Sequence, residues 1–103
     1  MAETAGTAAE PQTSDTETPT RWLARIHVTL KPIVLDPQGD AVLDGLHQLG
    51  FSGVSTVRVG KYLEVTLAAA SHADADATVS HMCERLLANP VIERYTFEVA
   101  PSR

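Results

Sequence analysis

The order in which two hydrophobic periodicities alternate constrains the fold of this chain more than any other feature of the sequence. Apolar and polar residues alternate from 22 to 30, the period of a half-buried β-strand. Apolar residues then recur at helical spacing from 37 to 49, and two β-rich runs follow at 54–59 and 62–68. A second helical stripe and a last alternating run at 91–99 complete the pattern. The predicted order of elements is therefore β-α-β-β-α-β.

This order, with its short connections, predicts an α+β fold of the ferredoxin-like kind. Such a fold has an antiparallel four-stranded sheet with both helices on one face. The dipeptide Gly60-Lys61 between the two central runs is typical of a two-residue type II′ turn, so we expect these runs to form a hairpin. The other face of the sheet stays open, and we expect Leu23 and Ile92 among its polar groups to mark a partner surface.

Local signals place the ends of the first helix. Asp36 followed by Pro37 indicates a helix start, because a carboxylate caps the free amide groups and proline fits the first helical turn. Gly50 is expected to supply the left-handed residue that ends the helix. Gly45 lies inside the helix at a cost of about 1 kcal/mol relative to alanine, which a close approach of the sheet backbone would explain.

The second helix is expected to follow a polar loop at 69–75. Asp74 or Asp76 is the predicted cap, and Asn89-Pro90 the predicted end. The predicted inward stripe consists of Val79, Cys83 and Leu86. In the last run, the predicted inward residues are Val91, Tyr95, Phe97 and Val99, together with Glu93.

The first 20 residues contain no Val, Ile, Leu, Phe, Tyr or Trp, so they cannot bury enough apolar surface to offset the entropy of ordering. We therefore expect a disordered acidic tail at 1–20 and a single domain at 21–103. The formal charge of −5 lies mostly in the tail, which leaves a nearly neutral domain and argues against nucleic-acid binding. No apolar run approaches the roughly 18 residues of a membrane span.

The sequence offers no set of residues that could run a reaction. Cys83 is the only cysteine, which excludes an internal disulfide and a Cys-based zinc site, and its place in an apolar stripe predicts a buried, unreactive thiol. The four histidines are scattered without metal-ligand spacing, and no glycine-rich phosphate loop is present. We therefore expect no catalytic residue, no cofactor and no metal on this chain.

Three stretches together resemble the PurS family, the small subunits of phosphoribosylformylglycinamidine synthase. The first runs from Val28 to Gly39 and includes VTLKP and VLDPQG. The second is VRVGKYLE at 57–64, and the third is MCERLLANPVIE at 82–93. They occur in the family's order and span nearly all of residues 22–99.

The resemblance implies a cytoplasmic complex of three kinds of chain that acts in purine biosynthesis. A glutaminase subunit (PurQ) releases ammonia from glutamine, and a synthetase subunit (PurL) uses ATP and magnesium to convert formylglycinamide ribonucleotide to formylglycinamidine ribonucleotide. The small subunit is then a non-catalytic adaptor of this ligase. It pairs as a homodimer or a tetramer, bridges the other two subunits and supports ammonia transfer. The resemblance implies neither a nucleic-acid partner nor a membrane.

Five polar residues in the matched stretches are candidates for contacts with a partner subunit. They are Lys31, Arg58, Lys61, Asn89 and Glu93. Arg58 and Lys61 are preferred, because they concentrate positive charge at a predicted turn of a nearly neutral domain. For Asn89 the needs of a turn are a stronger explanation than a partner contact.

Two other functions fit the same order of elements. A dimeric regulatory domain of this fold could bind a small molecule such as an amino acid, at the glycines Gly50 and Gly53 between the first helix and the next strand. An RNA-binding sheet would require exposed aromatic residues and a basic surplus, and only Tyr62 lies near the required position.

Overall fold

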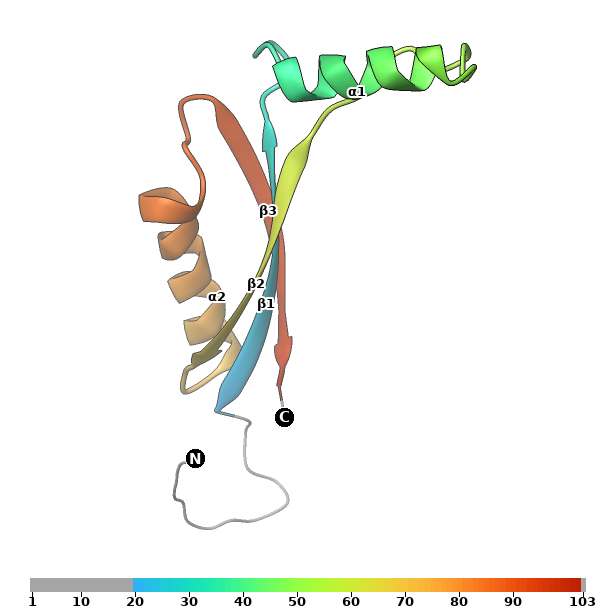
Figure 1. The fold of residues 1–103 in the computed structure, drawn as a ribbon. Helices are drawn as coiled ribbons and strands as arrows, with labels where there is room; N and C mark the ends of the chain where they lie inside the picture. The colour runs from blue at the N-terminus through green and yellow to red at the C-terminus, as the bar shows by residue number, and fades with distance from the viewer. Residues whose placement is uncertain (1–19, 103) are drawn as a thin grey trace.

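The computed structural model describes residues 20–102 of the chain (Figure 1). Its elements are β1 (Arg21–Leu30), α1 (Pro37–Gln48), β2 (Gly60–Ala68), α2 (His72–Met82), the π-helical turn η1 (Cys83–Leu87) and β3 (Glu93–Pro101). The predicted tail, apart from Thr20, lies outside the described residues. None of the helices within 20–102 has the length and apolar character needed to cross a membrane.

The sheet has three strands in the order β2-β1-β3, and β1 pairs antiparallel with both neighbours. The α+β class and the antiparallel pairing are as predicted, but the four-stranded sheet is wrong. Residues 54–59, the predicted second strand, pair with no strand in the described part of the chain.

The predicted hairpin at Gly60-Lys61 is also wrong. Gly60 is the first residue of β2 and pairs with Thr29, so the chain runs from 54–59 into β2 without turning back. A Cβ on Gly60 would lie 2.5 Å from the carbonyl oxygen of Val28. Glycine is therefore needed here for the close approach of two strands, and this pairing overrides the local preference for a turn.

The core lies between α2 and the sheet, where α2 packs against β3 and β1 (Figure 1). Its buried cluster comprises Ala24, Ile26, Val28, Val79, Cys83 and Ala88. The alternation predicted for the first strand is confirmed, since its even-numbered residues from Trp22 to Val28 are all buried. Cys83 is fully buried, as expected.

The start of α2 differs from the prediction. The Ser71 hydroxyl accepts a hydrogen bond from the backbone N–H of Asp74 at 3.1 Å, and the helix begins at His72. Neither Asp74 nor Asp76 is the cap, because both lie within the helix. Asp74 stands in the first turn, where a carboxylate interacts favourably with the helix dipole.

The π-helical turn η1 after α2 explains why Leu86, which was predicted to face inward, does not. In η1 the N–H of Ala88 donates to the carbonyl of Cys83 at 3.0 Å, a wider turn than that of an α-helix. The wider turn shifts the phase after Cys83, so Leu87 is half-buried and Leu86 is 81% exposed. Val91 is exposed as well, because it lies in the turn that precedes β3.

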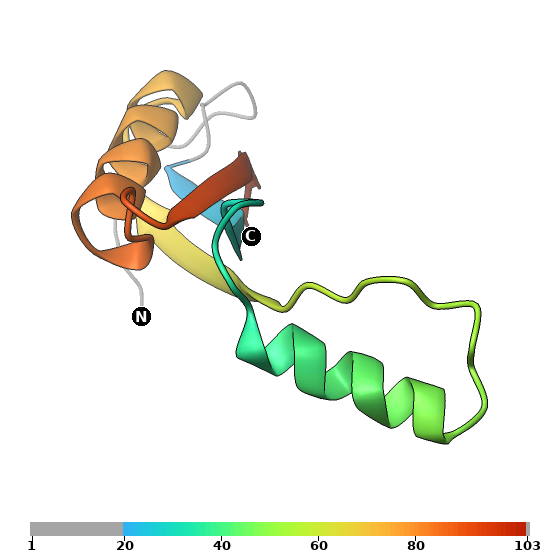
Figure 2. The same cartoon turned by 90° about the horizontal axis from the view of Figure 1, so that it is seen from above.

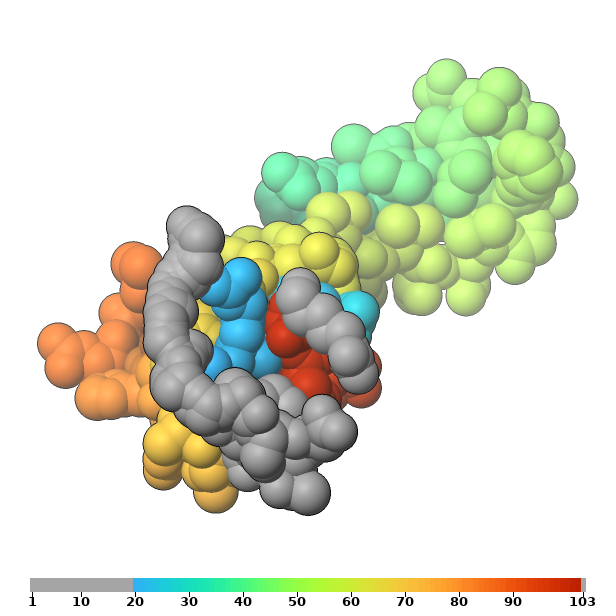
Figure 3. All heavy atoms as spheres, turned by 90° about the horizontal axis from the view of Figure 1, so that it is seen from below, coloured from blue at the N-terminus to red at the C-terminus, as the bar shows by residue number. Residues whose placement is uncertain are grey.

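Both predicted ends of α1 are confirmed: Asp36 caps the start, and Gly50, at φ 97°, follows the helix. The helix does not cover the sheet, however, so the prediction of two helices on one face is wrong. Figures 1 and 2 show α1 leaving the sheet, with the segment 54–59 returning beside it. We call residues 37–59 the arm, and the sheet with α2 and η1 the body. Figure 3 shows the arm projecting from the body in a space-filling view.

The open face of the sheet is mostly polar. Arg25 lies 4.0 Å from Glu64 on the neighbouring strand, and the rings of His27 and Tyr62 are 4.9 Å apart. Leu23 is half-buried on this face, as predicted from its alternation with buried neighbours. Ile92 belongs instead to the turn before β3.

Candidate functional site

Four of the five predicted docking residues gather at one end of the sheet, where β1 ends and β2 and β3 begin. Lys31 directly follows β1, and its N–H donates to the carbonyl of Ile92 at 2.8 Å. Arg58 and Lys61 lie on either side of the first residue of β2, and Glu93 is the first residue of β3. We call this region the junction, because it joins the sheet to the arm.

Asp36 is the central residue of the junction and is only 5% exposed. Its Oδ1 accepts from the N–H of Gly39 at 2.9 Å, and its Oδ2 accepts from the N–H of Val59 at 2.7 Å. The bond from Val59, followed by the bond from Gly39, lowers the pKa of the Asp36 carboxyl below its usual 3.8. One carboxylate therefore ties the start of α1 to the chain just before β2. The sequence predicted the cap, but no sequence signal pointed to Val59.

Arg58 also stabilises the junction, through the loop between β1 and α1. Its guanidinium donates to the backbone carbonyl of Lys31 at 3.0 Å and to that of Val34 at 2.9 Å. These two bonds fix the loop between β1 and α1. The positive charge of Arg58 also contributes to the lowered pKa of Asp36. Arg58 thus has a structural role that the prediction of a docking residue did not include.

Gly39 allows the first turn of α1 to lie close to the segment 54–59. A Cβ there would collide with the carbonyl oxygen of Val57 and would lie 2.8 Å from Oδ2 of Asp36. Any other residue would push the first turn of α1 away from the 54–59 segment. The direction in which the arm leaves the body is therefore set by Gly39 together with the Asp36 carboxylate.

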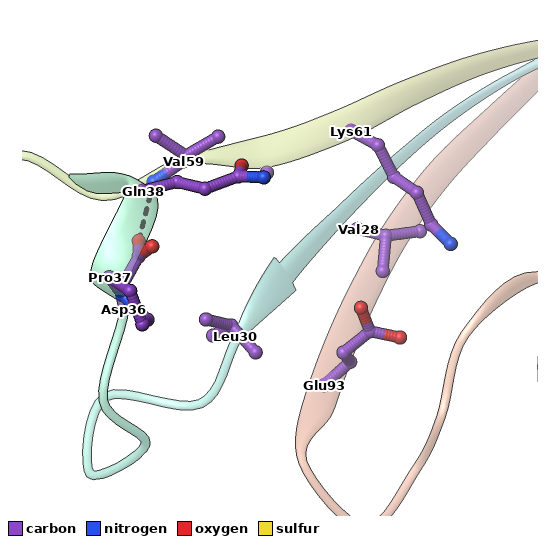
Figure 4. Close-up of a pocket in the computed structure, with 9 residues that line it drawn as sticks. Val28, Leu30, Asp36, Pro37, Gln38, Val59, Lys61 and Glu93 are labelled. Carbon is purple, nitrogen blue, oxygen red and sulfur yellow. Dashed lines mark hydrogen bonds between the residues drawn. The ribbon is translucent and has the colours of Figure 1, made fainter. Parts of the chain in front are cut away.

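A cavity of about 450 Å³ opens beside the junction. Its lining residues are Val28, Leu30, Asp36, Pro37, Gln38, Val59, Gly60, Lys61 and Glu93 (Figure 4). Lys61 and Glu93 come from the two strands that flank β1, and their charged ends point into the space between them (Figure 4). The cavity thus combines an apolar floor with charges of both signs, a mixture suited to contacts with a protein surface.

Asn89 and Glu93 form a local turn. The Glu93 carboxylate accepts from the N–H of Asn89 at 2.7 Å, and the Asn89 side-chain oxygen accepts from the N–H of Val91 at 3.1 Å. The turn interpretation of Asn89 is therefore confirmed. Glu93 keeps a second carboxylate oxygen for other contacts.

The described residues contain no arrangement for covalent or metal chemistry. Burial, and secondarily the charge of Glu84, raises the pKa of the Cys83 thiol, so this sulfur is neither exposed nor ionised at neutral pH. No group of three or more His, Cys, Asp or Glu side chains within 20–102 is placed to hold a metal ion. Gly50 and Gly53, the expected amino-acid site of a regulatory domain, lie in the turn that follows α1, and the strand expected directly after them at 54–59 does not form in the described chain.

Comparison with known proteins agrees with the motifs. Residues 23–101 match the family model described as PurS: Phosphoribosylformylglycinamidine (FGAM) synthase. A PurS subunit from Synechocystis is 59% identical over 75 residues, which cover 73% of this chain and 75% of that relative. A Bacillus subtilis PurS subunit is 51% identical over 78 residues, which cover 76% of this chain and 92% of that relative.

Solved structures give the same result. Bacillus subtilis PurS has a TM-score of 0.69 at 48% identity, covering 77% of this chain and 98% of that one. A chain in the structure of PurLQS from Thermotoga maritima has a TM-score of 0.71 at 29% identity, covering 78% of this chain and 98% of that one. On its sequence match and its fold, this chain belongs to the PurS family, the small subunits of the ligase phosphoribosylformylglycinamidine synthase.

Proposed function

We propose that this chain works as the homodimeric adaptor between the glutaminase and the synthetase of that ligase. The observation that carries the proposal is its similarity, along 78% of its length, to a chain of the Thermotoga maritima PurLQS complex. The surface of the described residues supports the same role. The described residues hold no reactive group, whereas charged and apolar surface gathers at the junction and along the arm.

An adaptor of this kind solves a chemical problem without supplying a catalytic group. Ammonia released into bulk water at neutral pH is protonated and lost as a nucleophile, so the glutaminase and synthetase sites must be joined in a closed assembly. ATP and magnesium are then bound by the synthetase subunit, and this chain holds the assembly together. We place the complex in the cytoplasm.

Within the adaptor, we propose Lys61 and Glu93 as the principal docking residues. Lys61 is exposed, and both side chains point into the cavity beside the junction (Figure 4). The other three candidates mainly fix the loops around them. The Arg58 guanidinium donates to the backbone carbonyl of Lys31, and the side chain of Asn89 holds the turn before β3.

Co-expression with candidate glutaminase and synthetase chains, followed by native mass measurement, tests the proposal. We expect a complex that contains a pair of copies of this chain with both partners. Formylglycinamidine ribonucleotide should form from glutamine only when all three kinds of chain are present. Full glutamine-dependent activity without this chain would contradict the adaptor role.

The docking residues are tested by comparing Lys61→Ala with Arg21→Ala, which removes an exposed cation from the opposite end of the sheet. We expect Lys61→Ala alone to weaken binding to the partner subunits. The deficit should shrink as salt is added, because interfacial charge pairs are screened. Equal binding by both variants at low and high salt would place the docking surface elsewhere.

A further inference from the structure

The cavity beside the junction holds two opposite charges that no described residue satisfies. Within 20–102, the ammonium group of Lys61 forms no hydrogen bond and no ion pair, although it carries three donors. Glu93 uses one carboxylate oxygen to accept from the N–H of Asn89 at 2.7 Å, and its other oxygen remains available. Figure 4 shows both charged ends pointing into the space between them. The cavity therefore offers one cationic and one anionic group to a ligand.

The register of the sheet keeps these two groups apart. Lys61 lies opposite Val28 on one side of β1, and Glu93 lies opposite Leu30 on the other side. Two inter-strand spacings of about 4.8 Å and a step of two residues place their Cα atoms roughly 12 Å apart. A direct ion pair would require both side chains to extend fully over Val28 and Leu30. A molecule that carries both charges can instead bridge them.

The surface between the two charges is apolar. Val28 is 1% exposed, and Leu30 and Val59 line the same cavity. The Asp36 carboxylate also lies there, but each of its oxygens already accepts a backbone N–H. The volume of about 450 Å³ is within the range of small-molecule sites, roughly 300–1,000 Å³. A few convergent polar groups around an apolar floor are the usual composition of such a site.

We propose that this cavity binds a free α-amino acid with an aliphatic side chain. The α-carboxylate of the ligand accepts from the Lys61 ammonium group, and its α-ammonium group donates to the available carboxylate oxygen of Glu93. Both are charge-assisted hydrogen bonds, which are stronger than bonds between neutral groups. The aliphatic side chain lies on Val28 and Leu30, where it is removed from water.

Other classes of ligand match the cavity less well. An inorganic anion would satisfy Lys61 alone and would be repelled by Glu93 and Asp36. A metal cation or an amine would meet the reverse difficulty at Lys61. A nucleotide carries several negative charges, whereas the lining offers one cationic side chain. A zwitterion leaves neither charge unpaired, which matters because a charged group that loses its hydration must be compensated.

Occupancy of the cavity should also affect partner binding. This part of the inference rests on the proposed function, because it requires Lys61 and Glu93 to be docking residues. An amino acid that bridges the two side chains withdraws both charges from a partner surface. The level of free amino acid would then control how much of the chain is available to the glutaminase and the synthetase.

Titration calorimetry of the full chain with L-leucine tests the site. We expect a dissociation constant below about 1 mM, which is within reach of a ligand of this size. Isocaproate lacks the ammonium group of leucine and isoamylamine lacks its carboxylate, so each should bind at least about tenfold more weakly. L-Aspartate keeps both charges but places a third on the apolar floor, so it should also bind more weakly. No binding of leucine, or equal binding of leucine and its two singly charged analogues, would overturn the proposal.

Three variants test whether the ligand occupies this cavity. Lys61→Met removes the cation at similar length, and Glu93→Gln removes the anion but keeps an oxygen that can accept from the Asn89 N–H. Each should raise the dissociation constant for leucine at least about tenfold. Arg21→Ala, at the opposite end of the sheet, is the control and should bind leucine as the wild type does. Equal dissociation constants for all three variants would overturn the site.

Methyl NMR of the wild type decides the location of the ligand if a variant does not fold. Leucine should shift the methyl signals of Val28, Leu30 and Val59, which line the cavity. The methyl signals of Val79, which is buried in the core under α2, should not move. Shifts confined to methyl groups outside the cavity would overturn the site.

These measurements use this chain alone, so they are independent of the partner subunits. Leucine binding by a chain that joins neither glutaminase nor synthetase would contradict the adaptor role and leave the site intact. A chain that joins both partners but does not bind leucine would do the reverse. Where both hold, saturating leucine should weaken partner binding, and unchanged partner binding would overturn the competition between ligand and partner.

Discussion

The body and the arm follow different rules, although they come from the same short chain. In the body, three residues that sequence periodicity marks as inward, Ile26, Val79 and Cys83, are inaccessible to solvent, and only Leu86 and Val91 of the predicted inward residues are strongly exposed. In the arm, the same kind of periodicity leaves Leu49 more than three-quarters exposed. Both stretches are amphipathic. The difference is that the single chain buries the inward residues of the body's core but leaves the apolar side of the arm exposed.

The body and the arm also differ in the kind of contact that holds them in place. The centre of the body is held by apolar packing between α2 and β1, where Ala24, Ile26, Val28, Val79 and Cys83 are buried. The arm is instead fixed by polar contacts at the junction, the Asp36 carboxylate and the Arg58 guanidinium. Polar bonds set its direction, and its apolar side chains stay exposed within the described residues.

The largest effect is expected in the core of the body. Ile26→Ala should reduce the free energy of unfolding by about 2–5 kcal/mol, because it leaves a cavity among fully buried neighbours. Leu49→Ala, in the arm, should cost much less at low protein concentration, because Leu49 is 76% exposed in the single chain. Urea unfolding of both variants across a range of protein concentrations measures the contrast. A Leu49→Ala loss as large as that of Ile26→Ala, and independent of concentration, would show that the arm is covered within its own chain.

The next effect concerns the junction and depends on pH. The folded-state pKa of Asp36 is depressed, so the stability that its carboxylate contributes is present above the ordinary value of 3.8 and is lost as pH falls through the folded value. Asp36→Asn should therefore lower the Tm at pH 7, and the gap from the wild type should narrow as the solution is acidified below about pH 4.

Thermal unfolding of both proteins from pH 7 to pH 3 checks this prediction. Asp40→Asn is a suitable control, since Asp40 is an exposed carboxylate in the first turn of the same helix. A gap between the wild type and Asp36→Asn that stays constant down to pH 3 would mean that the charge of Asp36 does not stabilise the junction.

The features of the fold that were predicted correctly are set by residues that are neighbours in the sequence. The Asp36 cap, the Gly50 stop and the strand at 21–30 each follow from the chemistry of a few consecutive residues. The hairpin was not predictable in the same way. The turn preference of Gly60-Lys61 is local, whereas the pairing of Gly60 with Thr29 and its closeness to the Val28 carbonyl join distant parts of the chain.

The candidate site shows the same limit. The motifs named residues that the fold brings together, since Lys31, Arg58, Lys61 and Glu93 lie at one end of the sheet. Their separate tasks depend on tertiary geometry, however. Only the fold shows that the Arg58 guanidinium is occupied by two backbone carbonyls, while Lys61 stays exposed beside the cavity.

A smaller effect is expected at Gly45, where a gain or a loss of stability distinguishes two arrangements of the arm. In a free-standing helix, Gly45→Ala should stabilise the arm by up to about 1 kcal/mol. If the arm lies close against a partner's sheet, the added methyl group should instead weaken the dimer. Helicity by circular dichroism and the dimer dissociation constant, measured on the same samples, separate the two cases. Ala41→Gly, at an exposed position of the same helix, is the matched control for helix propensity alone.

The smallest effect is expected from removing residues 1–19. This segment carries four acidic groups, no Lys or Arg, and no large aliphatic or aromatic side chain beyond its initial methionine, so its composition offers the body little to pack against. We expect the deletion to leave both the Tm and the dimer mass unchanged. Trp22→Ala is the matched comparison just inside the body, because Trp22 is 3% exposed and its indole donates to the carbonyl of Ala69 at 3.2 Å. That variant should lose about 3–5 kcal/mol of stability, in line with other buried aromatic truncations. A fall in Tm on deletion that approaches the effect of Trp22→Ala would make the first 19 residues a third structural region, and the division into body and arm would then be incomplete.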